Sequence, residues 1–487
     1  MTESRTAPQT PPLPFVRNEM IAPAAPPRGD SGILHWMREN LFRGPLNIAL
    51  TLCGLAAIWL LIAKFGPWLS HAVWHADSLR ECRQIITERY GEGATGACFA
   101  VIKHRWNQFL FGFYPRAEYW RPTLAFGLLF FAIAPVLFSD SLRGRRSVLA
   151  LASVLTFMAC QILGASGTHL LVAALGMVLW VALIEYRPRW SLIATLVYPF
   201  LGVWLLWGGS VWFPVLALAG FVLGYAVSRV LARLGMIGLA IGVVAALLFW
   251  GFAYHPLGSA LGTALPLSLP RVPSTQFGGF VLSITIGVAG IAMSLPAGII
   301  LALARQSHLP VVRMLAVMFI EFIRGVPLIG MLFVASLLLN YFLPPKVQFD
   351  IILRVIVMVT IFASAYMAEV IRGGLAALPK GQYEAADALG LDYWKAQRLI
   401  ILPQALKVSI PSIVSTFIGM FKDTTLVTFV GLYDPLKAMS DSVRASFEWK
   451  GTYWEPYLFA GAIFFILCFG MSRYSLYLER KLKRDQR

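Results

Sequence analysis

Apolar stretches long enough to cross a lipid bilayer recur along almost the whole of this 487-residue chain. A helix needs about 20 mostly apolar residues to span the hydrocarbon core, which is about 30 Å thick. The candidate spans are residues 46–63, 122–138, 148–163, 170–184, 192–206, 211–227, 235–252, 277–304, 315–342, 351–372, 408–432 and 456–471. A composition of 58% hydrophobic and 13% charged residues excludes a soluble globule of this length. The sequence predicts an all-α polytopic membrane protein with about twelve spans.

The basic residues give these spans an orientation. The net charge is +17, but the arginines cluster in short segments between apolar runs, which argues against nucleic-acid binding. Those in alternate loops are Arg143, Arg145, Arg146, Arg187, Arg189, Arg229, Arg233, Arg305 and Arg313. The positive-inside rule makes this face cytoplasmic, together with both termini. Residues 1–45, rich in Pro and polar residues, predict a disordered cytoplasmic tail, and residues 476–487 predict a basic one.

The polar segment 65–121 lies between the first two candidate spans and therefore falls on the opposite face. It contains Cys82 and Cys98, which this topology places in an oxidising space. A disulfide between them is one interpretation, and two unpaired thiols are the other. Neither the cysteines nor the histidines have the spacing of a metal site, and no catalytic Ser/His/Asp arrangement is found.

A charged, helix-prone segment at 379–403 interrupts the apolar runs on the predicted cytoplasmic face. Pro379 suits the first position of a helix, and Gly390 can adopt the left-handed conformation that ends one. Asp392 can cap a second short helix, which Pro403 is expected to stop. The segment predicts two helices joined by a glycine turn at the membrane surface, where a soluble partner could bind. An interfacial amphipathic helix without a partner is the alternative.

Several positions in this segment resemble the EAA loop of ABC importer permeases. The matching residues are Glu384, Ala385, Ala386, Gly390, Leu402 and Pro403. In that family the loop forms a coupling helix, which docks into a groove on the ATPase subunit. The resemblance implies that these residues couple the chain to a separate ATPase.

Three further motifs resemble polar amino-acid permeases, in particular the long subunit of general L-amino-acid importers. They are EFIRGVPLIGMLF at 321–333, SAYMAEVIRGG at 364–374 and FKDTTLVTFVGLYD at 421–434. The resemblance implies a five-span type I ABC importer core at 276–475, with the coupling loop at 379–403. It also implies an N-terminal extension at 46–275, with extra spans and a periplasmic loop at 65–121. Residues 147–230 do not match the family and are interpreted as a lipid-facing or subunit-packing appendage.

Ionisable residues within a membrane mark either function or a structural pair. The candidate substrate-pathway residues are Lys422, Asp423, Thr424, Thr425, Glu321 and Arg324. An amino-acid zwitterion needs an anion donor and a cation acceptor, which the patch around Lys422 and Asp423 could supply. A buried interhelical network that fixes packing is the alternative for this patch.

Two acid–base pairs have the i, i+3 spacing that places both members on one helix face. Glu321 and Arg324 precede a Gly-Val-Pro sequence at 325–327, which should break or kink the helix. A structural ion pair is the alternative to a substrate contact for them. Glu369 and Arg372 lie near the predicted cytoplasmic end of their span, which indicates an interfacial anchor or a contact with the coupling loop.

The chain has no Gly-x-x-x-x-Gly-Lys-Ser/Thr phosphate-binding loop. It is therefore expected to carry no cofactor and to hydrolyse no ATP itself, with ATP and Mg bound by the partner ATPase. The resulting hypothesis is a permease subunit of the bacterial inner membrane that imports polar L-amino acids by alternating access. Its implied partners are an ATPase dimer, a second permease chain forming a heterodimer, and a periplasmic amino-acid-binding protein.

Two other classes of protein are alternatives to this hypothesis. An ion-coupled secondary transporter usually shows repeated halves with broken helices at matching positions, and no such symmetry is found. A membrane-embedded transferase would need clustered catalytic polar residues at one membrane face. Only the arginine-rich segment 65–121 offers candidates, and it lacks a nucleophile or metal pattern.

Overall fold

A computed structural model describes residues 33–137, 191–338 and 349–484, with a few single positions and short pieces between them. The candidate spans 148–163 and 170–184 lie mostly outside the described residues, as does the beginning of the predicted tail at 1–45. The later part of that tail is not disordered, because helix α1 occupies Ile33–Asn40. The hydrophobic side chains of α1 recur with the period of a helix, so that they share one face. This segment is short and follows Pro-rich residues, and the sequence therefore did not predict it as a helix.

The described chain forms two units. The smaller takes in the described residues up to Ala72 together with Arg83–Ala97. Its main element is α2 (Pro45–Ser70), which begins with Pro at the first helical position and has no buried residue. A helix that is apolar on every side and exposes all of them is suited to hydrocarbon rather than to water.

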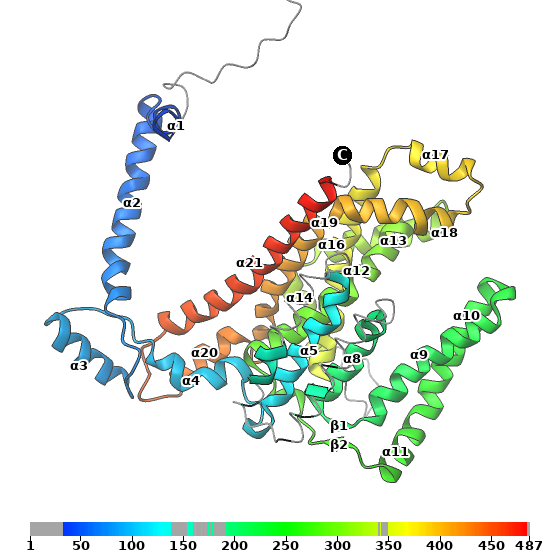
Figure 1. Ribbon diagram of the computed structural model, residues 1–487, viewed down its shortest axis with the longest axis horizontal. Helices are drawn as coiled ribbons and strands as arrows, with labels where there is room; N and C mark the ends of the chain where they lie inside the picture. Colours follow the sequence, from blue (N-terminus) through cyan, green and yellow to red (C-terminus); the bar gives the residue numbers. More distant parts are fainter. Residues whose placement is uncertain are drawn as a thin grey trace, which may run out of the picture. The chain divides into compact units, whose positions relative to one another are not determined.

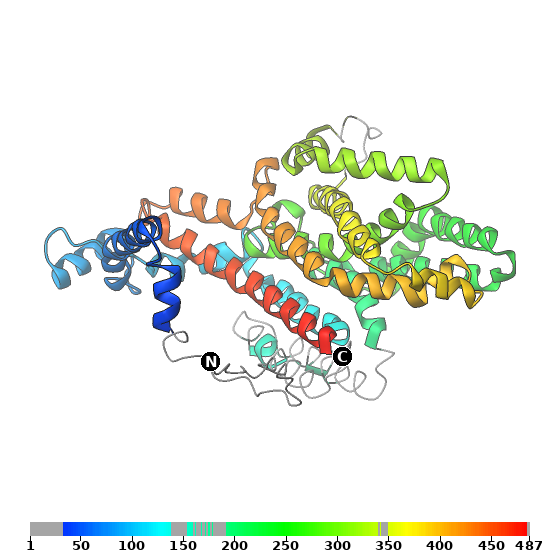
Figure 2. The same cartoon turned by 90° about the horizontal axis from the view of Figure 1, so that it is seen from above.

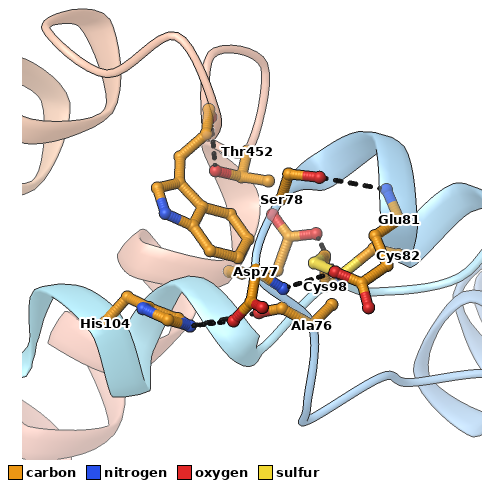
Figure 3. Close-up of a disulfide and its surroundings, with 10 residues drawn as sticks. Ala76, Asp77, Ser78, Glu81, Cys82, Cys98, His104 and Thr452 are labelled. Carbon is orange, nitrogen blue, oxygen red and sulfur yellow. Dashed lines mark hydrogen bonds and ion pairs between the residues drawn. A yellow bond between two sulfur atoms is a disulfide. The ribbon is translucent and has the colours of Figure 1, made fainter.

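The larger unit takes in Val73–Cys82 and Cys98–Arg487. Cys82, near the start of α3 (Leu79–Tyr90), forms a disulfide with Cys98, and their Cα atoms are 6.0 Å apart. Figure 3 shows this bond beside Asp77 and His104, the latter on α4 (Ala100–Phe111). The backbone N–H of Cys98 donates to the buried carboxylate of Glu455, 3.0 Å away. Of the two interpretations of these cysteines, the structure contains the bonded pair.

The rest of the extension is helical apart from one small ribbon. Its elements are η1 (Arg116–Glu118), α5 (Trp120–Leu137), α8 (Ser191–Trp207), β1 (Gly209–Ser210), α9 (Trp212–Val230), η2 (Ala232–Leu234), α10 (Met236–Leu248), η3 (Phe249–Ala253), α11 (Tyr254–Ala264) and β2 (Ser268–Leu269). Strands β1 and β2 pair antiparallel and close the base of a hairpin in which α9 packs along α10 and α11 (Figure 1).

The elements from residue 274 onward form a bundle. They are η4 (Ser274–Gln276), α12 (Gly279–Arg305), α13 (Pro310–Gly325), α14 (Leu328–Phe333), η5 (Val334–Leu338), α16 (Ile351–Ala376), α17 (Gly381–Ala388), α18 (Tyr393–Ala396), η6 (Gln397–Ile401), α19 (Leu402–Asp423), η7 (Thr424–Val430), α20 (Pro435–Arg444) and α21 (Trp454–Arg484). Helix α16 packs against both α12 and α19, and α19 also contacts α21 (Figure 2). The largest apolar cluster joins this bundle to α5 and α8.

Seven described helices are long and apolar enough to span a membrane. An eighth span is formed if α13 and the α14–η5 segment are counted together, although they meet at 100°. The break falls at the Gly-Val-Pro sequence, which confirms the predicted kink. The all-α class is also confirmed, since β1 and β2 are the only strands in the described parts of the chain. The count of about twelve remains a prediction because two candidates lie outside those parts.

Arg121 fastens separate segments of the extension to one another. Its side chain is completely buried, and its Nε donates to the carbonyl of Leu205 at 2.7 Å. Its Nη1 donates to the carbonyl of Pro270 at 2.8 Å, and the hydroxyl of Tyr114 donates to the carbonyl of Leu206 at 2.7 Å. These bonds satisfy carbonyls at the end of α8 and in the segment that leads into α12. Three parts of the chain that are distant in sequence are therefore held at one point.

Replacing Arg121 should destabilise the fold strongly. In Arg121→Ala, the carbonyls of Leu205 and Pro270 lose their donors in a buried site, which is expected to lower the free energy of unfolding by about 3 kcal/mol. Thermal unfolding of the purified chain in detergent measures the effect. Arg80→Ala, at an exposed position, is the matched control. Equal melting temperatures for the two variants would contradict the role given to Arg121.

Candidate coupling site

The coupling loop contains two helices with a glycine turn between them, as the sequence predicts. Gly390 follows α17 with φ +67°, the left-handed region that favours glycine. The Asp392 carboxylate then accepts the backbone N–H of Lys395 at 2.8 Å and caps α18. This hydrogen bond, assisted by an ion pair with the Lys395 ammonium at 3.1 Å, lowers the pKa of Asp392 below its usual value. Gly390 and Asp392 thus determine the turn through their own backbone and side-chain preferences.

The predicted stop at Pro403 is wrong. Helix α18 passes through the π-turn η6 into α19, and the three together with η7 form one 38-residue helical stretch, Tyr393–Val430. Pro403 lies in the first turn of α19, directly after the π-turn. A π-turn changes the backbone hydrogen-bond pattern at the position where proline has no N–H to donate, so the helix can continue. The second loop helix is consequently the beginning of a span.

One face of the loop is packed against the ends of the spans. Ile401 and Ala405 are fully buried in an apolar cluster with Ile320 of α13, and with Ala368 and Ile371 of α16. This cluster also includes Ala302 of α12 and the partly buried Tyr383 of α17. The side-chain amide of Gln404 donates to that of Gln382 at 2.9 Å and fastens α19 to α17. The loop is therefore braced against three helices of the bundle.

The other face of the loop exposes apolar side chains. Leu389 is 73% exposed, Trp394 67% and Leu399 64%. Of the EAA residues, Ala386 is buried, whereas Glu384 and Ala385 lie on the surface. A rigid element that presents large apolar groups beside charged ones has the character of a protein-binding surface.

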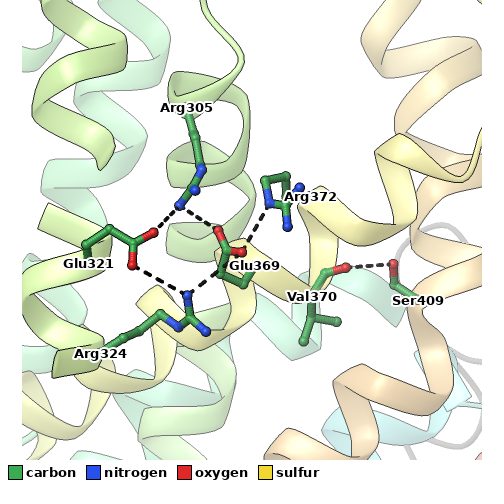
Figure 4. Close-up of polar contacts among 7 residues, drawn as sticks. All are labelled: Arg305, Glu321, Arg324, Glu369, Val370, Arg372 and Ser409. Carbon is green, nitrogen blue, oxygen red and sulfur yellow. Dashed lines mark hydrogen bonds and ion pairs between the residues drawn. The ribbon is translucent and has the colours of Figure 1, made fainter. Parts of the chain in front are cut away.

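Five charged side chains form a network beside the loop (Figure 4). Glu369 of α16 lies 2.7 Å from Arg305 of α12, 3.1 Å from Arg372 and 3.8 Å from Arg324 of α13. Glu321 of α13 lies 2.9 Å from Arg305 and 3.9 Å from Arg324. The Glu369 side chain is only 16% exposed and the Glu321 side chain 53% exposed. Glu369 is thus the central and least accessible member.

The network joins the two pairs that the sequence presented separately. Glu321 and Arg324, considered for the substrate pathway, share partners with Glu369 and Arg372. Arg305 was counted only as a topology signal, although it contacts both glutamates. Arg305 lies at the end of α12, close to the ends of α13 and α16. No local sequence pattern predicts that these three helix ends meet. Whether Glu321 and Arg324 contact substrate remains a prediction.

The Lys422 and Asp423 patch lies at the end of α19, apart from this network. Thr424 and Thr425 bond back to their own helix, through the carbonyls of Phe421 at 2.7 Å and of Lys422 at 3.0 Å. Lys422 is exposed and Asp423 half-buried, and neither forms an ion pair within the described residues. Helix α14, which follows the 100° bend, packs against η7 directly after the patch. The end of α19 thus carries two adjacent opposite charges without an ion-pair contact in the described parts of the chain.

The described chain is thus an apolar helical bundle with a loop that packs on the bundle and exposes apolar side chains on its other face, an arrangement compatible with a membrane transport permease. Residues 294–484 match the family described as "Binding-protein-dependent transport system inner membrane component". The chain belongs to this family, among the amino-acid permeases of ABC transporters.

Similar permeases support this assignment, and BztC and YhdY match almost the whole chain. The glutamate/glutamine/aspartate/asparagine transport system permease protein BztC of Rhodobacter capsulatus is 57% identical, over 97% of this chain and 99% of that protein. The inner membrane amino-acid ABC transporter permease protein YhdY of Escherichia coli K12 is 34% identical, over 94% and 96%. The arginine transport system permease protein ArtQ of Bacillus subtilis is 32% identical, over 96% of its length but only 45% of this chain. The importer is favoured over the ion-coupled transporter and the transferase.

These matches correct one expectation. Residues 147–230 were interpreted as foreign to the family, yet a match that covers 97% of the chain must include them. The short permease ArtQ, in contrast, leaves more than half of the chain uncovered. Apolar spans have few sequence-specific constraints, since many hydrophobic residues serve equally well against lipid, and this region therefore offered no motif to match.

Removing the central charge of the network should destabilise the bundle. Glu369→Gln leaves three arginines facing the single carboxylate of Glu321 and is expected to cost about 2 kcal/mol, because the site is mostly buried. Glu321→Gln, at the more exposed glutamate, should cost less than about 1 kcal/mol and is the matched control. Thermal unfolding of both variants in detergent tests the difference. A larger loss for Glu321→Gln would show that the network is organised differently.

Proposed function

We propose that this chain imports glutamate, glutamine, aspartate and asparagine across a bacterial inner membrane as the permease subunit of an ABC importer. The supporting relationship is the 57% identity with BztC, whose name states these four cargoes, along essentially the whole of both chains. All four are small polar amino acids with an α-ammonium and an α-carboxylate group. This cargo class agrees with a pathway that presents both a positively and a negatively charged side chain.

The observation that carries the mechanism is the exposed apolar face of the coupling loop. In the proposed complex, Leu389, Trp394 and Leu399 insert into a groove of an ATPase subunit, which binds ATP and Mg. The loop end of the bundle then faces the cytoplasm, together with both termini, and the end that bears the Cys82–Cys98 disulfide faces the periplasm. An oxidising periplasm agrees with a bonded cysteine pair at that end.

Further subunits complete the proposed importer. A second permease chain, different from this one, pairs with it around the pathway, and an ATPase dimer engages both coupling loops. A periplasmic binding protein delivers the amino acid to the disulfide end. ATP binding draws the two loops together and opens the pathway outward, and hydrolysis restores the inward-open state, which is alternating access.

Lys422 and Asp423 are proposed to contact the cargo. The ammonium of Lys422 is suited to the α-carboxylate, and the carboxylate of Asp423 to the α-amino group. Their lack of ion-pair contacts within the described residues supports this assignment, because charges near hydrocarbon are costly unless a ligand, a partner or a cavity receives them. Adjacent helical residues point about 100° apart, so the two groups would grip the zwitterion from different sides.

The coupling role is tested by straining the glycine turn. Gly390→Val forces a β-branched residue to φ +67°, which costs about 1–2 kcal/mol and distorts the turn, although no atom lies within 4 Å to clash with it. Substrate-stimulated ATP hydrolysis by the assembled importer in proteoliposomes should fall by about tenfold, equivalent to about 1.4 kcal/mol. Gly381→Val, in the same loop but without a left-handed φ, should remain close to wild type. Unchanged hydrolysis in Gly390→Val would refute the coupling role.

The cargo site is tested by charge removal. Lys422→Ala and Asp423→Ala should each lower uptake of radiolabelled glutamate by at least about tenfold, since each leaves one charge of the zwitterion unpaired. Lys407→Ala, an exposed lysine nearer the other end of α19, is the control. Co-purification of the partner subunits separates ligand binding from assembly. Normal uptake in both test variants would remove the pair from the pathway.

A further inference from the structure

A pocket of about 550 Å³ opens between α8 and the α9–α11 hairpin, in the part of the chain for which the coupling mechanism gives no role. Its walls are mainly aromatic and aliphatic, and its volume is typical of sites that hold a small organic ligand. The lining used below is Val203, Trp204, Trp207, Phe213, Tyr254 and Arg271. Arg271 is the only ionisable group that lines it besides the Tyr254 phenol.

The aromatic walls are held in place. The indole N–H of Trp204 donates to the carbonyl of Gly209 at 3.0 Å, and that of Trp207 donates to the hydroxyl of Ser274 at 2.8 Å. Phe213 packs against Tyr254, with ring centroids 5.5 Å apart. Because the polar atoms of both indoles already have partners, their ring faces are free to line an apolar site. The pocket is thus formed before any ligand enters.

Arg271 supplies an uncompensated positive charge at the pocket. Its side chain is exposed and forms no ion pair or hydrogen bond within the described part of the chain. It runs past Gly209, where an added Cβ would lie 3.4 Å from its Nε. Gly209 has φ +86°, a conformation that favours glycine, and so leaves space beside the guanidinium. A planar guanidinium with free donors is well suited to a phosphate or carboxylate.

Exposed apolar side chains surround the pocket and are suited to contact with lipid. Val203 lines the pocket and is itself 52% exposed, and apolar side chains continue outward from it along two helices. Leu196 of α8 is 68% exposed, and Phe221 and Tyr225 of α9 are 57% and 66% exposed. The pocket lies where α8 ends and α9 begins, near Trp207 and Trp212, and tryptophans at the ends of membrane helices commonly meet lipid headgroups. An acyl chain can therefore enter from the hydrocarbon while its headgroup stays at Arg271.

We propose that this pocket binds an anionic lipid, with an acyl chain between Trp204, Phe213 and Tyr254 and the acidic headgroup on Arg271. An amino-acid cargo does not fit the same surface, because the pocket offers no acidic group to an α-ammonium. A phospholipid and a free fatty acid share the chemistry of an anion joined to a long chain. The lipid joins the hairpin to α8, which otherwise meet chiefly through the short β1–β2 ribbon and the first turns of α9.

Native mass spectrometry of the full-length chain in detergent tests the proposal. Wild-type protein is expected to retain one phosphatidylglycerol more tightly than phosphatidylcholine. Arg271→Gln should weaken phosphatidylglycerol binding by about tenfold, equivalent to about 1.4 kcal/mol, and leave phosphatidylcholine unchanged. Arg233→Gln, at the far turn of the same hairpin, is the matched control for loss of a positive charge. Equal phosphatidylglycerol affinity in the two variants overturns the proposal.

A second variant tests the apolar part of the site. Val203→Trp fills the pocket from a half-exposed position and should weaken binding of both lipids, whereas Leu239→Trp, at an exposed position of α10 that does not line the pocket, should not. If the wild type binds oleate but not phosphatidylglycerol, and Arg271→Gln no longer binds oleate, the ligand is a free fatty acid. That result would still support a site for an anion joined to a long apolar chain. Wild-type lipid binding by Val203→Trp would overturn the proposal. So would displacement of the lipid when the second permease chain assembles, because protein would then cover this face.

Discussion

The bilayer provides no partner for an ionised side chain, and this constraint organises the bundle at its coupling end. Glu369 is nearly buried on α16, and it is compensated by arginines from α12, α13 and its own helix. Satisfying one carboxylate therefore fixes the positions of three helix ends. Arg121 plays the corresponding part in the extension, where one guanidinium satisfies carbonyls from two segments. In both places a single charge determines how separated elements meet.

The coupling loop depends on this arrangement. Its inner face packs on the same helix ends that the ion network holds together, since Ile320 and Ile371 belong to the apolar cluster and lie on the same helices as Glu321 and Glu369. The loop is consequently an extension of the bundle rather than a mobile appendage. A displacement of Trp394 or Leu399 would therefore also move the helix ends on which the loop packs.

Much of this could be read from the sequence, and the failures have physical causes. Composition and span length gave the fold class, and glycine, aspartate and the Gly-Val-Pro sequence gave the loop turn, its cap and the kink, because each acts through local backbone geometry. The continuation of the helix through Pro403 depends on a π-turn, which no residue type specifies. Arg305 joins the network only through tertiary packing. The membership of residues 147–230 in the family was misjudged because their composition is mainly apolar and offers few residue-specific motifs.

The continuous helical stretch from Tyr393 to Val430 has a further mechanical consequence. At about 1.5 Å per residue the 38-residue stretch is about 57 Å long, and it reaches from the loop through the Lys422 and Asp423 pair. A rod of this kind transmits torque as well as thrust. Neighbouring residues at its far end differ in direction by about 100°, so a partial turn of the rod would change which of the two charges is presented. Any rotation of this helix would therefore change the direction of both charges at once, because they share one continuous backbone.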